Sequence, residues 1–357
     1  MTKNAAIIGG TGQIGVATAQ RLARDGWRVE LLHRGERTID PRVFEFDGTT
    51  TRVTTHRIDR SDTDALLEAT RGRDLVLDTI AYSPVDADQL RLLGGEVGSL
   101  VVISTASVYR GKNGGYLDKA TGPENFPDYP VPLREDSPLV DNDEQSYSPL
   151  KAAVERRLLD DAALPVSILR PGAIHGAHSP MLREWFFVKR ALDERPATLL
   201  AYDGESRFST SATANIAELV ALCAESPGRR VLNAVDDESL TVAEMGRIVY
   251  EVLGHDGEVR GIAGPPTDAG VGASPWALTH PIVMSMERAR TELGYRPVVS
   301  YTESVEGDIR WALDAVAAAE SAGRTWREAF PALVARYGAN EWFPYDAEDA
   351  YLARLAH

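Results

Sequence analysis

The chain has 357 residues, of which 25% are charged and 43% hydrophobic, and its formal net charge is −15. This acidity argues against a protein that binds the phosphate backbone of nucleic acids, because such proteins need a basic surface. No apolar run reaches the ~18 residues that indicate a membrane span, and the single cysteine, Cys223, permits no internal disulfide. We therefore expect a cytoplasmic globular protein without nucleic-acid or membrane partners, in which Cys223 is buried in a helix.

The first predicted element is a strand that ends in glycines. A short apolar run leads into Gly9, Gly10, Gly12 and Gly15, and an amphipathic segment, 16–25, follows directly. The spacing fits both G-x-G-x-x-G and G-x-x-G-x-x-G. Glycine tolerates positive φ and lets a pyrophosphate approach the backbone, while the next helix offers free N–H groups. The stretch predicts a dinucleotide-binding turn; a turn that only lets a strand pack on a helix is the alternative.

Apolar runs alternate with helical segments along the next part of the chain. The pattern predicts strands at 27–32, 53–58, 74–80, 99–104 and 165–169, and helices at 62–70, 147–161 and 184–191. Alternation of this kind indicates a doubly wound α/β fold of the Rossmann type, with a parallel sheet covered on both faces. Ligands bind such sheets beyond the carboxyl ends of the strands, so the informative residues should follow each strand.

The remaining organisation is less regular. The segment 110–146 is rich in Gly, Pro, Asp and Glu, and we predict that it is a lid that orders over bound substrate. The predicted domains are a dinucleotide-binding domain at 1–172, to which about 208–235 returns, a smaller interleaved C-terminal substrate-binding domain formed by 173–207 and 236–330, and an extension at 331–357.

Tyr147 and Lys151 are four positions apart in the helix predicted at 147–161, so their side chains share a face. Tyrosine has a pKa of ~10 and is a poor acid or base at neutral pH. A neighbouring ammonium favours the phenolate and lowers that pKa. This spacing of tyrosine and lysine occurs once in the chain and predicts an acid–base pair.

The third motif is the run 104–109, Ser-Thr-Ala-Ser-Val-Tyr, at the end of a predicted strand. A hydroxyl there can bond a substrate carbonyl oxygen and stabilise the charge that develops on it. A hydroxyl that only caps a local turn is the alternative.

Taken together, these motifs resemble those of the extended short-chain dehydrogenase/reductases, the NAD-dependent epimerase/dehydratase family, in order and spacing. The resemblance covers roughly 4–315 and is closest to the subgroup that includes the chloroplast stem-loop-binding proteins. The motifs that carry it are Gly9-x-x-Gly12-x-x-Gly15, Ser104-Thr105-Ala106-Ser107-Val108-Tyr109, Tyr147-x-x-x-Lys151, Arg170-Pro171-Gly172-Ala173-Ile174-His175-Gly176 and Leu293-Gly294-Tyr295-Arg296-Pro297.

The resemblance implies a role for each matching residue. Tyr147 is then the acid–base residue, and Lys151 holds the nicotinamide ribose and tunes Tyr147. Thr105 is the hydroxyl partner, and Asp59 matches the aspartate that contacts the adenine. The other cofactor contacts that it implies are Gly9, Gly12, Gln13, Ile14, Gly15, Arg60, Thr79, Ile80, Ala81 and Pro171.

The chain departs from the family pattern where the cofactor ribose is recognised. Members that use NAD have an acid after the second strand, which binds the ribose 2′-OH. Here His33 occupies that place and Arg34 follows, with Arg37 within reach of the same loop. Arginine can hold a 2′-phosphate, so the sequence favours NADP(H) over NAD(H). A solvated loop arginine is the alternative interpretation of Arg34.

Several further positions bear on the activity and on a possible metal site. Ala106 and Ser107 replace the Asp-Glu pair of the 4,6-dehydratases, which argues against that chemistry, and Asn215 replaces a usual aspartate with unknown effect. His175 and His178 lack the further ligands of a metal site. The aromatic segment 185–188 is more typical of a core than of a site, although in this fold it can wall the substrate pocket.

The sequence therefore predicts an NADP(H)-dependent oxidoreductase that transfers hydride to or from a carbonyl or secondary alcohol of a small molecule. The alternatives are a nucleotide-sugar epimerase with tightly bound NAD(P) and, from another class, a non-catalytic cofactor-sensing or RNA-binding protein. A homodimer is the candidate assembly, and no metal is expected.

Overall fold

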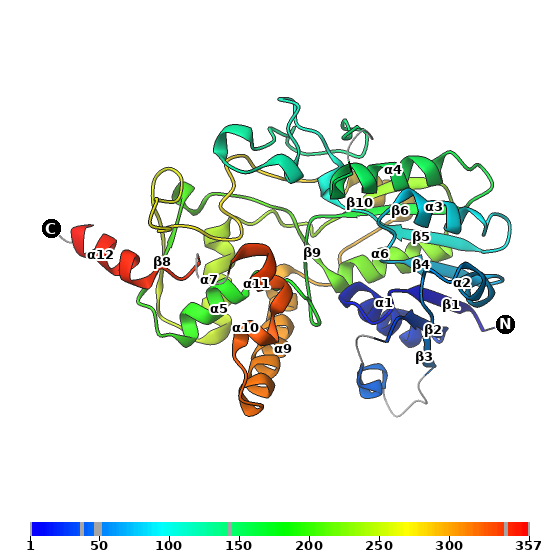
Figure 1. The fold of residues 1–357 in the computed structure, drawn as a ribbon, viewed down its shortest axis with the longest axis horizontal. Helices are drawn as coiled ribbons and strands as arrows, with labels where there is room; N and C mark the ends of the chain where they lie inside the picture. The colour runs from blue at the N-terminus through cyan, green and yellow to red at the C-terminus, as the bar shows by residue number, and fades with distance from the viewer. Residues whose placement is uncertain (1, 36–38, 46–51, 142–144, 339–341, 356–357) are drawn as a thin grey trace.

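The structure, a computed structural model, describes residues 2–35, 39–45, 52–141, 145–338 and 342–355. Its main body is a seven-stranded sheet in the order β10-β6-β5-β4-β1-β2-β3, in which all neighbouring strands are parallel (Figure 1). This arrangement confirms the predicted doubly wound α/β fold. The strands are β1 (Asn4–Ile8), β2 (Arg28–His33), β3 (Val53–Arg57), β4 (Leu75–Asp78), β5 (Ser99–Ile103), β6 (Val166–Pro171) and β10 (Arg230–Ala234).

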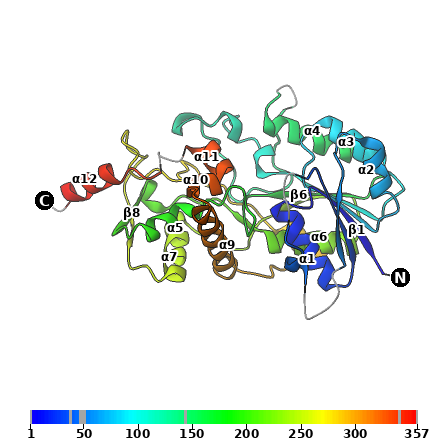
Figure 2. The same cartoon turned by 60° about the horizontal axis from the view of Figure 1, so that its bottom comes forward.

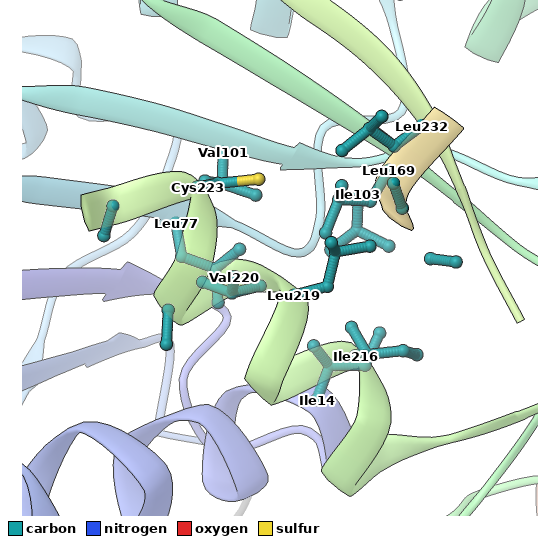
Figure 3. Packing of buried hydrophobic residues seen from close by; sticks show 14 of the residues in the cluster. Ile14, Leu77, Val101, Ile103, Leu169, Ile216, Leu219, Val220, Cys223 and Leu232 are labelled. Atoms are coloured by element: carbon teal, nitrogen blue, oxygen red, sulfur yellow. The ribbon is translucent and has the colours of Figure 1, made fainter. Parts of the chain in front are cut away.

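Helices cover both faces of the sheet (Figures 1 and 2). Those on one face are α1 (Gln13–Arg24) and α6 (Thr213–Glu225), and those on the other are α2 (Thr63–Thr70), α3 (Pro84–Arg91) and α4 (Tyr147–Leu159). Ile14 of α1 and Leu219 of α6 pack with Leu77 and Val101 of the sheet (Figure 3). Cys223 is fully buried in this cluster, as predicted.

A second region lies at the end of the molecule opposite the N-terminus (Figure 1). Its hydrophobic core contains the predicted aromatic segment 185–188, every residue of which is buried. The elements of this region are α5 (Trp185–Leu192), β8 (Ala197–Leu200), α7 (Val242–Leu253), β11 (Glu258–Gly261), α9 (Tyr301–Ser321), α10 (Trp326–Ala329), α11 (Pro331–Tyr337) and α12 (Tyr345–Leu355). Three further elements, β7 (Ala173–His175), β9 (Thr210–Ala212) and α8 (Glu287–Leu293), complete the chain.

The long segment between β5 and α4 is irregular, as predicted, but it is packed. Tyr116, Tyr129, Leu133 and Val140 are buried, and the Leu133 N–H donates to the Val283 carbonyl at 2.7 Å. These apolar anchors hold 110–141 against the body of the protein, so movement on substrate binding stays a prediction. Within the described ranges, no helix is long and apolar enough to cross a membrane.

Candidate active site

A cavity of about 1120 Å³ lies at the carboxyl ends of the central strands. Its wall is formed by residues that follow β1, β2, β4 and β5, together with the start of α4. Ligands in parallel sheets bind at this edge. The predicted site residues that line it are Gly9, Gly12, Gln13, Ile14, His33, Arg34, Asp59, Arg60, Thr79, Ile80, Tyr147 and Lys151.

The glycine turn has the backbone that a dinucleotide turn requires. Gly9 has φ +76°, and a Cβ there would overlap Thr79 Oγ1 and lie 2.9 Å from the Ile80 side chain. A Cβ on Gly12 would meet only the Gly9 carbonyl oxygen, at 3.4 Å, and α1 begins at the next residue. A Cβ on Gly15 would lie 2.6 Å from Gly10 Cα, so this third glycine allows the helix to pack on the turn. The turn and the helix N-terminus can therefore cradle a pyrophosphate.

Tyr147 presents its phenol to the other end of the cavity. Its side chain is 46% exposed there, and its ring lies 6.4 Å from that of Tyr82. Partial burial raises the pKa of Tyr147 to about 12, against a smaller lowering effect of the Thr105 hydroxyl. The phenol is therefore protonated at neutral pH and can donate a proton.

Lys151 also lines the cavity, although only 2% of its surface is exposed. Its ammonium donates to the carbonyl oxygens of Ala81 (2.7 Å) and Ile103 (2.6 Å), and it lies 5.4 Å from the centre of the Tyr82 ring. Burial lowers the pKa of Lys151 to about 8. The expected lowering of the Tyr147 pKa by Lys151 is not what the structure shows. The ammonium is directed to the two carbonyls, and desolvation of the phenol dominates instead.

The opposite end of the cavity holds the residues expected to contact adenosine. Arg60 forms ion pairs with Asp78 (2.7 Å) and Asp86 (2.7 Å). The Ser61 N–H and hydroxyl, and to a lesser extent the Arg34 charge, hold the pKa of Asp59 below its usual value. Arg34 is exposed and lines the cavity. Arg37 lies outside the described residues.

Four predicted residues do not line the cavity. Gly15 packs against Gly10 where α1 meets the turn, the Ala81 carbonyl accepts from Lys151, and Pro171 is buried in β6. Thr105 is half-buried, and its hydroxyl bonds that of Ser107 at 2.9 Å and also interacts with the Tyr147 phenol.

The cavity also has lining residues that the sequence analysis did not name. These are chiefly Tyr82, Ser83, Asp86 and Gln89. Tyr82 and Ser83 lie in the loop after β4, Asp86 and Gln89 lie in α3, and the capping box of Ser83 and Asp86 marks the start of that helix. Their position after a strand was the available signal.

His175 has a structural environment rather than a metal site. Its Nδ1 pairs with Asp308 at 2.9 Å and its Nε2 with Asp236 at 3.0 Å, and all three side chains are buried. Burial alone would lower the pKa of His175, but the two carboxylates raise it well above its ordinary value. Across the described residues, no cluster of three His, Cys, Asp or Glu side chains could hold a metal ion.

Asp236, one of the two carboxylates that pair with His175, also explains the asparagine at position 215. The Asn215 amide donates to Asp236 at 2.8 Å, and its oxygen accepts from the Val298 N–H at 2.8 Å. An aspartate at this position would place a second carboxylate against Asp236, which would be repulsive in a buried setting.

Comparisons with known proteins identify the fold. No protein-family model and no curated protein matched the sequence. The dTDP-glucose 4,6-dehydratase of Bacillus anthracis, solved with NAD, is 15% identical with a TM-score of 0.63, covering 88% of this chain and 97% of that one. The UDP-glucose 4-epimerase of Thermotoga maritima, solved with UDP-glucose, is 16% identical with a TM-score of 0.62, covering 87% and 99%. The UDP-glucuronic acid 4-epimerase of Bacillus cereus, solved with its substrate and NAD, is 16% identical with a TM-score of 0.61, covering 86% and 98%. The chain thus has the fold of the extended short-chain dehydrogenase/reductases.

Proposed function

We propose that this chain is an NAD(P)-dependent oxidoreductase of the short-chain dehydrogenase/reductase type, acting at a carbonyl or secondary alcohol carbon of a small molecule. The observation that carries the proposal is the placement of Tyr147, Lys151 and the glycine turn on one cavity at the strand ends. The cofactor, when bound, supplies or accepts the hydride. The turn Gly9–Gly12 and the α1 N-terminus would hold its pyrophosphate, and Lys151 would hold its ribose.

The residues of the chain then handle the proton and the substrate oxygen. Because burial raises the Tyr147 pKa to about 12, the phenol holds its proton at neutral pH. It is suited to deliver that proton to an oxygen that becomes an alkoxide on reduction. The Thr105 hydroxyl, next to the phenol, would hold the same oxygen and stabilise its developing charge.

A nucleotide-sugar epimerase is the second candidate, because the solved structures with this fold include the UDP-glucose and UDP-glucuronic acid 4-epimerases. In that reaction one carbon is oxidised and then reduced on its other face, with no net change in the cofactor. The two candidates differ in stoichiometry. A net oxidoreductase converts one cofactor per substrate, whereas an epimerase does not consume it.

The test is the variant Tyr147→Phe. We expect turnover to fall by about 10²–10⁴, which is typical for the loss of a general acid, while cofactor affinity stays within a few-fold. Substrate conversion and cofactor absorbance at 340 nm, recorded together, distinguish net redox turnover from epimerisation. Retained turnover in the variant would reject Tyr147 as the proton donor.

We also propose that NADP(H) is preferred. Arg34 lies directly after β2 and lines the cavity, where a 2′-phosphate would gain charge-assisted hydrogen bonds. Such bonds contribute roughly 1.5–3 kcal/mol, and the lower end suits an exposed loop, which gives about a tenfold preference. Arg34→Ala should weaken NADP(H) and leave NAD(H) almost unchanged in fluorescence titrations of both cofactors. Equal affinities of the wild type for NADP(H) and NAD(H) would contradict the role of Arg34 in binding the 2′-phosphate.

A further inference from the structure

The cavity wall around Tyr147 is partly aromatic. Tyr82 is 51% exposed and Tyr147 46%, with an angle of 49° between their rings. Lys151 is the cation at this end, and its ammonium already donates to two carbonyls, while Asp86, which lines the same cavity, accepts from the Tyr82 and Ser83 N–H groups. The other residues that form this end are Ser83, Ile103, Ser104, Ile174 and Pro180. Half-exposed aromatic rings of this kind favour an apolar or aromatic group on the ligand.

The cations behind this wall are turned away from it. The segment 177–207, which follows the wall residue Ile174, contains five Lys and Arg side chains, and none of them lines the cavity. Each is engaged by an internal partner. The pairs are Arg183 with the Tyr337 hydroxyl (2.9 Å), Lys189 with Asp193 (2.6 Å), Arg190 with Glu348 (2.7 Å), Arg195 with Asp349, and Arg207 with the Ser239 carbonyl.

Carboxylates also lie near the two phenols. Asp118 accepts from the Ser148 N–H and hydroxyl, both at 2.7 Å, and its charge contributes to the raised pKa of Tyr147. Asp78 and Asp86 act in the same direction on Tyr82. Arg60, which pairs with both of these aspartates, partly offsets their effect on Tyr82.

A nucleotide diphosphate would therefore meet an unfavourable site. Its two phosphates need cationic partners, as a rule arginine in bidentate geometry, to replace the water that they lose. Of the basic side chains that line the cavity, Lys151 already donates to two carbonyls and Arg60 is already paired with two aspartates. Arg34 lies at the other end of the cavity, beside Asp59, where the cofactor adenosine is expected.

From these observations we infer that the substrate is an uncharged ketone or secondary alcohol that carries an aromatic or similar apolar group, with Tyr82 as a specificity-determining residue. This inference rests on the proposed function and decides between its two candidates, because it disfavours nucleotide sugars. A neutral ligand loses little hydration in such a pocket, and its ring can pack on Tyr82 while its oxygen meets Tyr147.

The test measures binding to the full chain saturated with cofactor. Acetophenone and UDP-glucose are titrated separately, with ligand-observed NMR for the first and calorimetry for both. We expect acetophenone to bind at least tenfold more tightly than UDP-glucose. Tyr82→Ala should weaken acetophenone binding about two- to tenfold. The matched control, Tyr351→Ala in α12, lies off the cavity and should have no effect.

Three results would overturn the inference: UDP-glucose binding as tight as acetophenone, no acetophenone binding, or an unchanged affinity in Tyr82→Ala. Cofactor affinity and thermal melting of the variant show that its fold is intact. If UDP-glucose binds while turnover still depends on Tyr147, the inference fails and the proposed function stands. If the cofactor does not bind, or Tyr147→Phe stays active, the proposed function itself fails.

Discussion

Replacing His175 with glutamine should destabilise the fold in a pH-dependent way. The imidazolium lies between Asp308 of α9 and Asp236, which follows β10, so it joins the large sheet to the second region. Glutamine keeps a polar side chain of similar length but carries no charge. The variant therefore leaves two buried carboxylates without their cation.

The structure bounds the size of the effect. Burial raises the pKa of Asp236, but the hydrogen bond and charge of His175, with bonds from Ala212 and Asn215, lower it from 3.8 to about 2. That fall corresponds to about 2 kcal/mol of unfolding free energy. Removing one partner from a buried ion pair typically costs about 3–5 kcal/mol. Asp236 keeps its bonds from Thr210 (2.7 Å) and Asn215 (2.8 Å), so we expect about 3 kcal/mol.

The dependence on pH follows from the direction of each shift. The raised pKa of His175 means that its stabilisation is complete below about pH 6.5, the unfolded value, and is lost as pH rises through the folded value. The lowered pKa of Asp236 means that its contribution is lost as pH falls from about 4 to about 2. Burial raises the pKa of Glu184, so its contribution to folding stability falls as pH rises, in the wild type and in the variant alike. The difference between the wild type and the variant should therefore narrow towards alkaline pH.

Urea unfolding at pH 6 and pH 9 measures this difference. His56→Gln is the control, because His56 is exposed on β3 and lies 3.7 Å from Glu30. A loss below 1 kcal/mol at pH 6, or an equal loss at both pH values, would show that the charged imidazole does not hold these elements together.

Two more predictions concern the site. Lys151→Ala should reduce both turnover and cofactor affinity. Because burial lowers the Lys151 pKa to about 8, the wild type should bind the cofactor more weakly above about pH 8, whereas the affinity of the variant should not change with pH in this way. Cofactor titrations of both proteins at pH 7 and pH 9 check this. The segment 110–141 should gain protection from hydrogen exchange when cofactor and acetophenone are both present, and unchanged protection would reject a lid.

The fold, and the position of Tyr147 and Lys151 on the candidate site, were predictable because they follow from local patterns. Gly9 at the end of an apolar strand needs its positive φ, and Tyr147 and Lys151 share a helix face whatever the rest of the chain does. The partners of Lys151 were not predictable. They are backbone carbonyls of Ala81 and Ile103, at the ends of two other strands, and no side-chain pattern marks such acceptors. For this reason the expected effect of Lys151 on the Tyr147 pKa was wrong.

The buried charges show the same limit at longer range. His175, Asp236 and Asp308 are far apart in sequence and meet only in the folded chain. Position 215 appeared as an unexplained departure, yet its amide is required by the carboxylate that the fold places beside it. The reason for a residue that departs from a sequence pattern can thus lie in a contact that forms only in the folded chain.

The C-terminal extension contributes to the electrostatics of the substrate region. Of the five basic side chains in 177–207, three are held by partners from this extension: Tyr337, Glu348 and Asp349. The pair of Arg190 and Glu348 is almost fully buried, at 1% exposure for each side chain. Because breaking a buried ion pair leaves an uncompensated charge, Glu348 holds Arg190 inside the core. The extension thereby helps to keep the Tyr147 end of the cavity without a free cation, and the neutral substrate that we infer depends on residues about 200 positions further along the chain than Tyr147.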